Sequence, residues 1–518
     1  FVLGAILSYQ NTTTMKTFYT FILFFLSFTV LAQNEISGTV LDEKNKPIAG
    51  ANIYIDGTYD GATSDENGKF SFSTTNTGNQ TLVISFVTYE TLSIAIDVAN
   101  YKNKTVKLRE SVNSLDAVIV TAGTFDAGEK ARISVLKPLD IVTTAGAMGD
   151  IVSALQTLPG TNTVGEDGRL FVRGGEADET QTFVDGIRVA QPYGATTANV
   201  PTRGRFSPFL FSGMSFSTGG YSAEYGEALS SVLLLNTQDE MVEEKTDISL
   251  MTVGLGLANT QKWGKNSISF NTAYINLEPY QRLIPQNADW NKPFQSLSGE
   301  AVYRHDFENG LFKLYAAFDA SQFDINQESI NSTTKTRVDL NNNNFYLNAS
   351  YKANLSNHWQ LFSGLSYGYG QNKIGLDVND VENNEHSSHL KIRLKKSFSD
   401  RVKLTFGADY FITKFDEDFK AYEGDTFNSG YNANIAAFFT EADIFFSKKF
   451  AGKFGVRLSN NDLLEETVVS PRASLAYKVS KSGQFSLAYG SFTQAPRQDY
   501  LKYADYLESE KADHYILN

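Results

Sequence analysis

The chain has 518 residues, with 58 Asp and Glu against 45 Lys and Arg, and a formal net charge of -13. This charge argues against nucleic acid as a partner, because binding phosphate groups needs a basic face. The sequence has no Cys, which excludes a disulfide framework, a thiolate metal site and a lipid-modified cysteine anchor.

The N-terminal stretch is predicted to lie outside the fold. Residues 1–14 precede the first Met, and we interpret them as upstream translation that is not native. Met15-Lys16 is followed by the apolar run FYTFILFFLSFTVL, which is shorter than the roughly 20 residues that a membrane-spanning helix needs. The run ends near the small residue Ala32, as secretory signal peptides do. Residues 15–32 therefore predict export, and a cysteine-free exported chain suits a bacterial envelope.

Residues 33–112 contain short β-rich runs separated by turns. The alternation in LVISFV and the pair Asn67-Gly68 indicate an antiparallel β-sandwich of about 75 residues. The strings GTVLDEKNKPIAGANIYIDGT and GATSDENGKFSF resemble the carboxypeptidase regulatory-like domain, a transthyretin-like β-sandwich. The resemblance implies a binding or spacer module without peptidase chemistry.

The linker 113–124 contains the run DAVIVTA, whose composition favours a β-strand. Exposed extended segments can add as a strand to the sheet edge of a partner, where main-chain hydrogen bonds hold them. The alternative is that Val118–Val120 forms an edge strand of a neighbouring domain. The residues of the run are Asp116, Ala117, Val118, Ile119, Val120, Thr121 and Ala122.

Residues 125–240 are rich in Gly and in loop signals. The segment GDIVSALQTLPG predicts an amphipathic helix over Ile151 to Leu158, ended by a Pro-Gly pair. With three further elements it resembles the plug domain of TonB-dependent outer-membrane receptors, although Ser231 stands where many members have Gly. The four elements are Pro159-Gly160, Arg173-Gly174-Gly175, Asp185-Gly186, and Tyr221, Tyr225 and Gly226 in GGYSAEYG.

This resemblance assigns expected roles to the plug and to the linker. The glycines permit turns with positive φ, Asp185-Gly186 should turn between two plug strands, and Arg173 should pair with acidic groups on the plug or the barrel wall. Because it lies just ahead of the plug, the segment Asp116 to Ala122 resembles the TonB box. TonB with its inner-membrane motor is then the implied partner.

Residues 245–518 show a period of two. In NFYLNASYKANL and RVKLTFGADYFI, apolar residues alternate with polar ones, which predicts transmembrane β-barrel strands with one lipid-facing and one wet face. About 13 strands are expected, and residues 245–262 should form two of them that turn near Gly254. Long polar connections are expected to be extracellular loops, at about 278–295, 326–342, 375–387, 417–430, 460–468 and 495–511.

An open sheet of about 13 strands would leave backbone groups bare in lipid. The family that the chain resembles closes its barrel at 22 strands, so the sequence is expected to be a fragment. The predicted fold is all-β: an N-terminal transthyretin-like β-sandwich, a mixed plug domain, and about 13 strands of a 22-stranded transmembrane β-barrel.

Other candidate sites carry less support. No G-x-x-x-x-G-K-[ST] pattern accompanies Arg173, and no G-x-S-x-G elbow occurs, so neither nucleotide binding nor catalysis is expected. Glu385, His386 and His389 lie in a predicted extracellular loop, but two His without a third placed ligand make a poor metal site. We expect a solvated loop there, and no catalytic residue, metal or cofactor.

The resulting hypothesis is a receptor and transporter in the bacterial outer membrane, surrounded by lipid, with its plug and N-terminal domain facing the periplasm. It would take up a scarce or bulky nutrient into the periplasm, energised by TonB. The alternative is an outer-membrane ligand-binding platform or adhesin without active transport, with a surface lipoprotein as a candidate partner. The identity of the ligand and the residues that contact it stay open.

Overall fold

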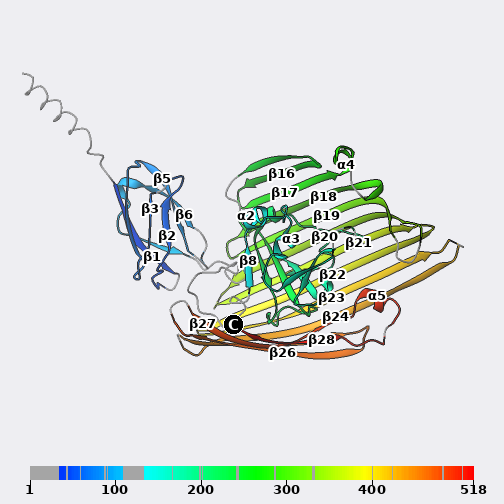
Figure 1. Cartoon of the computed structure of the whole chain (residues 1–518). Coiled ribbons are helices and arrows are strands. Elements are labelled where there is room, and N and C mark those ends of the chain that lie inside the picture. Colours follow the sequence, from blue (N-terminus) through cyan, green and yellow to red (C-terminus); the bar gives the residue numbers. More distant parts are fainter. Residues whose placement is uncertain are drawn as a thin grey trace, which may run out of the picture. The chain divides into compact units, whose positions relative to one another are not determined.

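The computed structural model falls into two compact units, residues 1–114 and 115–518, which are described separately below (Figure 1). It describes residues 34–108 and 133–518, apart from gaps at 43–44, 59, 87–88, 90–91, 166, 198–199, 201, 241–243, 285–287, 329–332, 357, 400, 423, 448, 481–482 and 505. The predicted signal peptide and the segment Asp116 to Ala122 lie outside the described residues.

The first unit is a β-sandwich of two sheets. One sheet has the order β4-β1-β7 and the other β3-β2-β5-β6, with only β1 and β7 parallel among the paired strands. Alternate residues of β1 point inward, so that Ile36 and Val40 are fully buried against Ile53 and Leu82. The bounds are β1 (Asn34–Asp42), β2 (Asn52–Ile55), β3 (Gly61–Thr63), β4 (Lys69–Thr74), β5 (Asn79–Ser85), β6 (Leu92–Asp97), η1 (Val98–Asn100) and β7 (Lys104–Leu108).

The second unit begins with the plug, built around a five-stranded sheet of order β12-β11-β14-β13-β8. Helix α3 begins after Asp150, which caps it by accepting a hydrogen bond from the Ser153 amide at 2.8 Å, and ends at Leu155, three residues before the predicted end. Turns continue the chain to Leu158. The bounds are β8 (Ile133–Leu136), α2 (Pro138–Thr143), α3 (Ile151–Leu155), β9 (Thr161–Val164), β10 (Asp167–Val172), η4 (Ala177–Glu179), β11 (Thr180–Val184), β12 (Ile187–Val189), η5 (Pro208–Leu210), β13 (Phe211–Ser217) and β14 (Ser231–Thr237).

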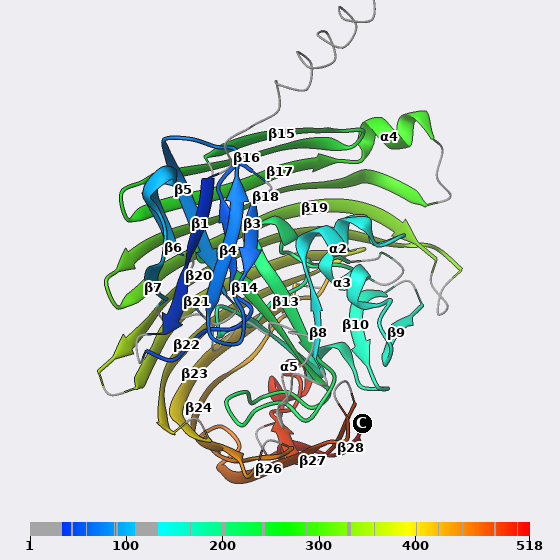
Figure 2. The ribbon, with the colours of Figure 1, turned by 90° about the vertical axis from the view of Figure 1, so that its left-hand side faces the viewer.

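A sheet of 14 antiparallel strands, β15 to β28 in chain order, curls around the plug (Figure 2). The first two strands turn at residues 252–253, as expected. The bounds are β15 (Lys245–Met251), β16 (Gly254–Trp263), β17 (Asn266–Asn276), α4 (Glu278–Leu283), β18 (Asp289–Phe307), β19 (Gly310–Gln327), β20 (Thr336–Leu355), β21 (Trp359–Leu376), β22 (Asn379–Ser399), β23 (Val402–Lys420), β24 (Thr426–Phe445), β25 (Phe450–Asn461), β26 (Glu466–Lys478), β27 (Gln484–Gln494), α5 (Gln498–Leu501) and β28 (Glu510–Leu517).

Several predicted extracellular loops are wrong, because the strands continue through them. Strands β21 and β22 are joined by residues 377–378 alone, so the predicted loop 375–387 is mostly strand, and the predicted loops 326–342 and 417–430 are largely strand as well. The outward series of β21 explains the error: Leu365 and Tyr367 are followed by Gln371 and Lys373. Where both faces of a strand contact water, polar residues occupy both faces. The alternation of apolar and polar residues that predicts a strand is then absent.

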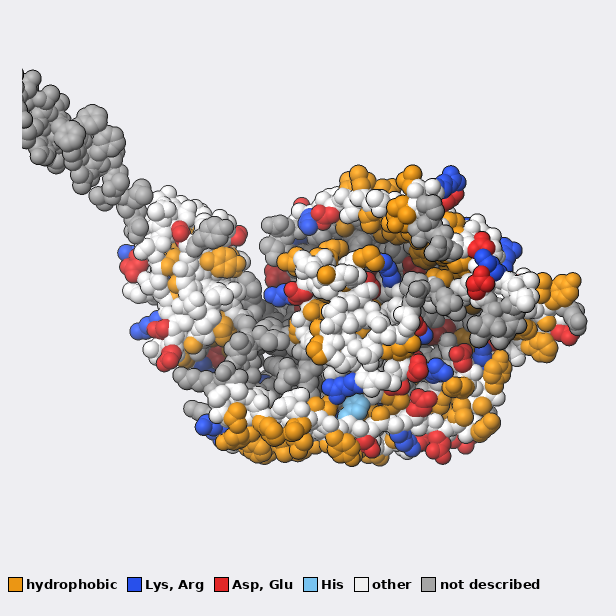
Figure 3. Space-filling model, viewed as in Figure 1, with side chains coloured by type: hydrophobic (Ala, Val, Ile, Leu, Met, Phe, Trp, Pro, Cys, Tyr) orange, Lys and Arg blue, Asp and Glu red, His pale blue; other side chains and the backbone are white. Residues whose placement is uncertain are grey.

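The outer surface of the sheet is apolar where the bilayer would contact it. Hydrophobic side chains gather on the outer surface over β26 to β28 (Figure 3), where Leu487 and Leu517 are more than half exposed. No helix among the described residues is long and apolar enough to cross a bilayer.

Candidate functional site

The turn between β11 and β12 ties the plug to the wall of the barrel. Asp185 and Gly186 both have positive φ, 49° and 82°, and form the tight turn that the sequence predicts. Asp185 is 2% exposed as a residue, and its carboxylate lies 2.6 Å from Nζ of Lys313 on β19. It also accepts hydrogen bonds from the amide of Thr237 at 3.0 Å and its hydroxyl at 2.7 Å, while Asp239 lies 2.7 Å from the same ammonium. The turn was predictable, but this buried ion pair between plug and wall was not.

The two strands joined by this turn are held by side chains of two wall strands, β20 and β22. Asn348 of β20 donates to the Val184 carbonyl at 2.6 Å, and Tyr346 donates to the Arg188 carbonyl at 3.2 Å. The Arg188 amide donates to Nδ1 of His389 on β22 at 2.9 Å. Backbone groups of the plug edge that strand pairing leaves open are thus satisfied by the wall.

The solvated loop expected around Glu385 and His389 is wrong, because both residues lie in β22 and face the plug. His389 is 2% exposed and its Nε2 lies 3.0 Å from Asp409, while Glu385 accepts a hydrogen bond from Gln191 of the plug at 2.9 Å. Alternation along β22 places His386 on the opposite face, with its Nδ1 2.8 Å from the Tyr367 hydroxyl. Among the described residues, no group of three His, Asp or Glu side chains is placed to hold a metal ion.

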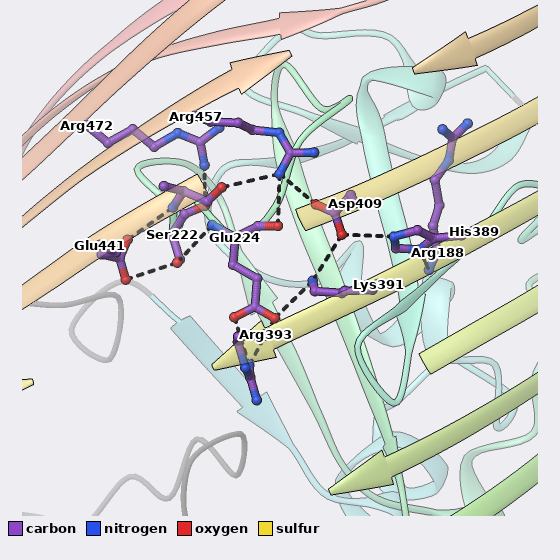
Figure 4. Close-up of polar contacts among 11 residues, drawn as sticks. Arg188, Ser222, Glu224, His389, Lys391, Arg393, Asp409, Glu441, Arg457 and Arg472 are labelled. Atoms are coloured by element: carbon purple, nitrogen blue, oxygen red, sulfur yellow. Dashed lines mark hydrogen bonds and ion pairs between the residues drawn. The ribbon is translucent and has the colours of Figure 1, made fainter. Parts of the chain in front are cut away.

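The loop 219–229, which carries the motif GYSAEYG, makes the second set of wall contacts (Figure 4). Glu441 of β24 accepts hydrogen bonds from the Ser222 hydroxyl and the Ala223 amide, both at 3.0 Å. Arg457 of β25 donates to the Ala223 carbonyl at 3.4 Å, and Arg472 of β26 donates to the Ser222 carbonyl. Side chains of the wall therefore hold the loop mainly by hydrogen bonds to its backbone.

Ion pairs between charged side chains also join the same loop to the wall (Figure 4). The Glu224 carboxylate lies 2.8 Å from Arg393 and 2.9 Å from Nζ of Lys391, which is fully buried. Asp409 balances the wall cations, at 2.7 Å from Arg457 and 3.9 Å from Lys391. The Lys391 ammonium also lies 4.9 Å from the centre of the Tyr225 ring, a favourable cation–π contact.

The Tyr and Gly residues of this motif have structural roles. Tyr221 is 1% exposed, donates to the Ala228 carbonyl at 2.5 Å and packs on Phe492 of β27 with ring centres 4.5 Å apart. Gly226 faces the Arg457 guanidinium so closely that a Cβ at this position would overlap it. The motif thus shapes a loop that fits the wall.

The remaining motif residues stabilise turns within the plug. Gly160 and Gly174 have φ of 87° and 83°, and the Arg173 amide donates to the Gly160 carbonyl at 2.9 Å. The Gly175 amide donates to the Val172 carbonyl, which closes the second turn. The Thr161 amide donates to the Leu158 carbonyl across Pro159, where the helical turns end.

The predicted ion pair of Arg173 is wrong. Its guanidinium donates to the hydroxyl of Thr218 at 3.2 Å, and no carboxylate of the described part of the chain lies within ion-pair distance of it. Arg173 itself has φ of 52°, so its backbone is part of the turn.

The segment Asp116 to Ala122 lies outside the described residues, and β8 is the first described strand that follows it. β8 begins at Ile133 and lies at the edge of the plug sheet; among the described residues it pairs with β13 alone, through the four residue pairs from Ile133 to Leu136. A partner that pulled on the segment would load this edge strand first.

Comparisons with known proteins agree with this architecture. Residues 36–120 match the family model of the CarboxypepD_reg-like domain, 127–232 the TonB-dependent receptor plug domain, and 280–515 the TonB-dependent receptor-like β-barrel. TonB-dependent receptor P39 of Formosa agariphila is 27% identical over 290 residues, 49% of this chain and 25% of that protein.

Solved structures share the fold at low sequence identity. A mutant of the ferric enterobactin receptor PfeA from Pseudomonas aeruginosa is 13% identical, with a TM-score of 0.54 over 72% of this chain and 64% of that chain. The alcaligin outer-membrane receptor FauA from Bordetella pertussis is 13% identical, with a TM-score of 0.53 over 73% and 64%. The outer-membrane transporter YddB from Escherichia coli is 11% identical, with a TM-score of 0.54 over 72% and 62%.

The chain therefore spans about a quarter of its curated relative and less than two thirds of these structures. It nevertheless carries the three domains in sequence, with the plug inside the curled sheet. The chain belongs to the TonB-dependent receptors of the bacterial outer membrane, with a carboxypeptidase regulatory-like domain ahead of its plug and barrel.

Proposed function

We propose that this receptor takes up a scarce or bulky nutrient into the periplasm without changing it chemically, and that TonB energises the uptake. The buried ion pairs between the plug and the wall support the need for an energy source. Removing one partner of such a pair costs about 3–5 kcal/mol, so a plug held by several of them will not leave the lumen spontaneously. The outer membrane holds neither ATP nor an ion gradient, and the energy has to come from a partner that reaches across the periplasm.

The observation that carries the proposal is the position of β8. It follows the segment Asp116 to Ala122 by only ten residues and, in the described part of the chain, is paired with one neighbouring strand. Force applied to the segment would therefore act first on the edge of the plug sheet. There, the four residue pairs between β8 and β13 would separate before the inner strands of the sheet do. We assign the TonB contact to Asp116–Ala122 by this placement together with the resemblance of DAVIVTA to the TonB box.

Two variants of this segment test the proposal. Replacing Val118 and Val120 by Pro removes two main-chain donors and should abolish both the binding of the C-terminal domain of TonB and the uptake of the nutrient. The matched control replaces the same residues by Thr, which keeps the donors and the preference for strands. Deleting Asp116–Ala122 should likewise leave nutrient binding intact and abolish uptake.

Uptake that survives the Pro substitutions would contradict the mechanism. Dissipating the proton gradient separates a transporter from a binding platform, because only transport should stop while surface binding persists.

A further inference from the structure

Two histidines of the wall bind backbone groups of the plug in the same way. His389 of β22 accepts a hydrogen bond at Nδ1 from the Arg188 amide at 2.9 Å. His514 of β28 accepts one at Nδ1 from the Gly220 amide at 3.3 Å. The two contacts lie in separate parts of the plug, because Arg188 belongs to β12 and Gly220 to the loop 219–229.

The two ring nitrogens of each histidine have opposite roles. Nε2 of His389 lies 3.0 Å from the Asp409 carboxylate, and Nε2 of His514 lies 2.8 Å from the Leu229 carbonyl. These oxygens are acceptors, so each Nε2 carries a proton and donates it. A backbone amide can only donate, so each Nδ1 has to be without a proton. Both histidines therefore hold the docked plug in the neutral form that is protonated at Nε2.

Aromatic stacking fixes the orientation of both imidazole rings. The His389 ring stacks on Phe411 of β23 with centres 4.2 Å apart at 22°, and the His514 ring lies on Phe492 of β27 with centres 4.3 Å apart at 33°. Both phenylalanines are buried. Each Nδ1 is thus kept pointing at its plug amide, and neither ring can turn aside without losing its stacking partner.

The charges around His389 leave no room for a further positive charge (Figure 4). The Asp409 carboxylate that accepts from His389 also lies 2.7 Å from Arg457 and 3.9 Å from Lys391. The guanidinium of Arg188 lies over the same aromatic ring as His389. A second proton on His389 would add a cation to a group in which one carboxylate already faces two, and like charges repel at these distances.

The charges around His514 have the same sign. Positive charge acts on it from Arg173 of the plug and from Arg472 of β26, whose guanidinium lies 4.3 Å from the centre of the Phe492 ring. Asp513 is the neighbouring carboxylate, but side chains alternate along β28 and it points to the opposite face. A second proton on His514 would therefore also be added beside cations.

We propose that His389 and His514 make the docking of the plug sensitive to acid. An imidazole exposed to water takes up a second proton below about pH 6.5. In the docked plug that proton would have to sit on Nδ1, where it would face the N–H of Arg188 or Gly220 and replace an attraction by a repulsion. The docked plug thus binds fewer protons than the released plug, so docking weakens as the pH falls through this range.

This inference goes beyond nutrient uptake, because it concerns the plug and the wall alone. The outer membrane sustains no ion gradient, so the pH of the medium is also the pH at the periplasmic face of the receptor. An acidic medium would therefore lower the force that releases the plug, whatever the ligand.

The test measures the protection of two plug amides from hydrogen exchange, in the full chain purified in detergent. The Arg188 amide reports on β12, and the Ala223 amide, which donates to Glu441, reports on the loop 219–229. Both values are corrected for the intrinsic pH dependence of exchange. In the parent protein the protection of both amides should fall at least tenfold, on the order of one proton per histidine, between about pH 7 and pH 5.

The carboxyl groups nearby do not give the same result. Free Glu side chains titrate near about pH 4.3, which is below the range measured. Glu227 and Glu385 lie close enough to Arg188 to act on it. Burial raises the pKa of Glu227, and its protonation stabilises the docked loop as the pH falls, the opposite of the effect expected from the histidines.

The decisive variant combines His389→Gln with His514→Gln. A Gln amide has an acceptor and a donor, as the neutral imidazole has, but it does not titrate. Protection should then be nearly independent of pH over the same range. The matched control is His386→Gln on the opposite face of β22, where Nδ1 lies 2.8 Å from the Tyr367 hydroxyl, and it should keep the fall seen in the parent. Protection that does not fall in the parent, or that falls as steeply in the double variant, would overturn the proposal.

A second measurement needs no variant. Nitrogen-15 NMR of the imidazole rings in the parent protein should show Nε2 protonated and Nδ1 unprotonated for both histidines at neutral pH. A proton on Nδ1 of either histidine in the docked plug would contradict the assignment. Neither experiment involves TonB or a nutrient, so failure here is distinguishable from failure of the transport proposal.

Discussion

Replacing Lys313 by Met is expected to destabilise the docking of the plug by about 3–5 kcal/mol, the usual cost of removing one partner from a buried ion pair. Lys313 and Asp185 are each 1% exposed, and Asp239 shares the same ammonium. Without the ammonium, the hydrogen bonds that remain to the Asp185 carboxylate among the described residues are the two from Thr237. Hydrogen exchange at the Arg188 amide should accelerate about a hundredfold or more, because this amide donates to Nδ1 of His389 on the wall when the plug is docked.

The matched control for this experiment is Lys414→Met. Lys414 pairs with Asp416 at 2.8 Å, but both side chains are about half exposed on the outer face. Exposed pairs contribute about 0–1 kcal/mol, so exchange at the Arg188 amide should stay unchanged. Equal effects of the two substitutions would show that the Lys313 pair does not hold the plug.

Replacing Glu224 by Gln should release the second set of wall contacts. The substitution preserves shape but removes the negative charge that Lys391 and Arg393 share, and leaves Asp409 at 3.9 Å as the remaining carboxylate near Lys391 among the described residues. A fully buried ammonium that loses its partner destabilises the docked loop, again by about 3–5 kcal/mol. Bacteria carrying this variant should admit a glycopeptide antibiotic too large for porins.

Glu227→Gln is the matched control, three residues further along the same loop. Burial raises the pKa of Glu227, which accepts a hydrogen bond from the Ala495 amide at 3.1 Å. A carboxyl with a raised pKa makes the folded state less stable as the pH rises above its unfolded value, so Gln should remove that pH dependence and leave the plug closed. Antibiotic entry that is the same in both variants would contradict the assigned role of Glu224.

The sequence predicts the architecture because each domain has a local signature. Alternation of apolar and polar residues indicates the barrel strands, and the glycine turns and the Tyr-x-x-x-Tyr-Gly motif indicate the plug. The comparisons confirm this identification and the placement in the outer membrane. The local signatures were sufficient because they depend on residues close together in the chain.

The contacts between plug and wall could not be predicted in the same way. Asp185 and Lys313 are 128 residues apart, and no local pattern joins them. His389 looked like part of a solvated loop because its neighbours Glu385 and His386 are polar, yet the strand turns one of them toward the plug and the other outward. Where both faces of a strand are polar, the sequence does not distinguish a strand from a loop.

We propose that TonB opens the plug by pulling on its edge strand β8. The chain has no Cys, so Val135→Cys and Ser215→Cys introduce a single disulfide between β8 and its neighbour β13. Residues directly opposite in an antiparallel pair have Cα atoms about 4.5–5.5 Å apart, within the range that a disulfide spans. The substitutions leave the plug–wall contacts and the segment Asp116–Ala122 unchanged.

The decisive measurement is single-molecule force spectroscopy on the membrane-embedded protein, pulled through the immobilised C-terminal domain of TonB. With the disulfide reduced, β8 and the residues after it should extend before TonB detaches, by roughly 3.5 Å for each residue released. With the disulfide oxidised, that extension should disappear. An oxidised protein that extends as far as the reduced one would contradict the claim.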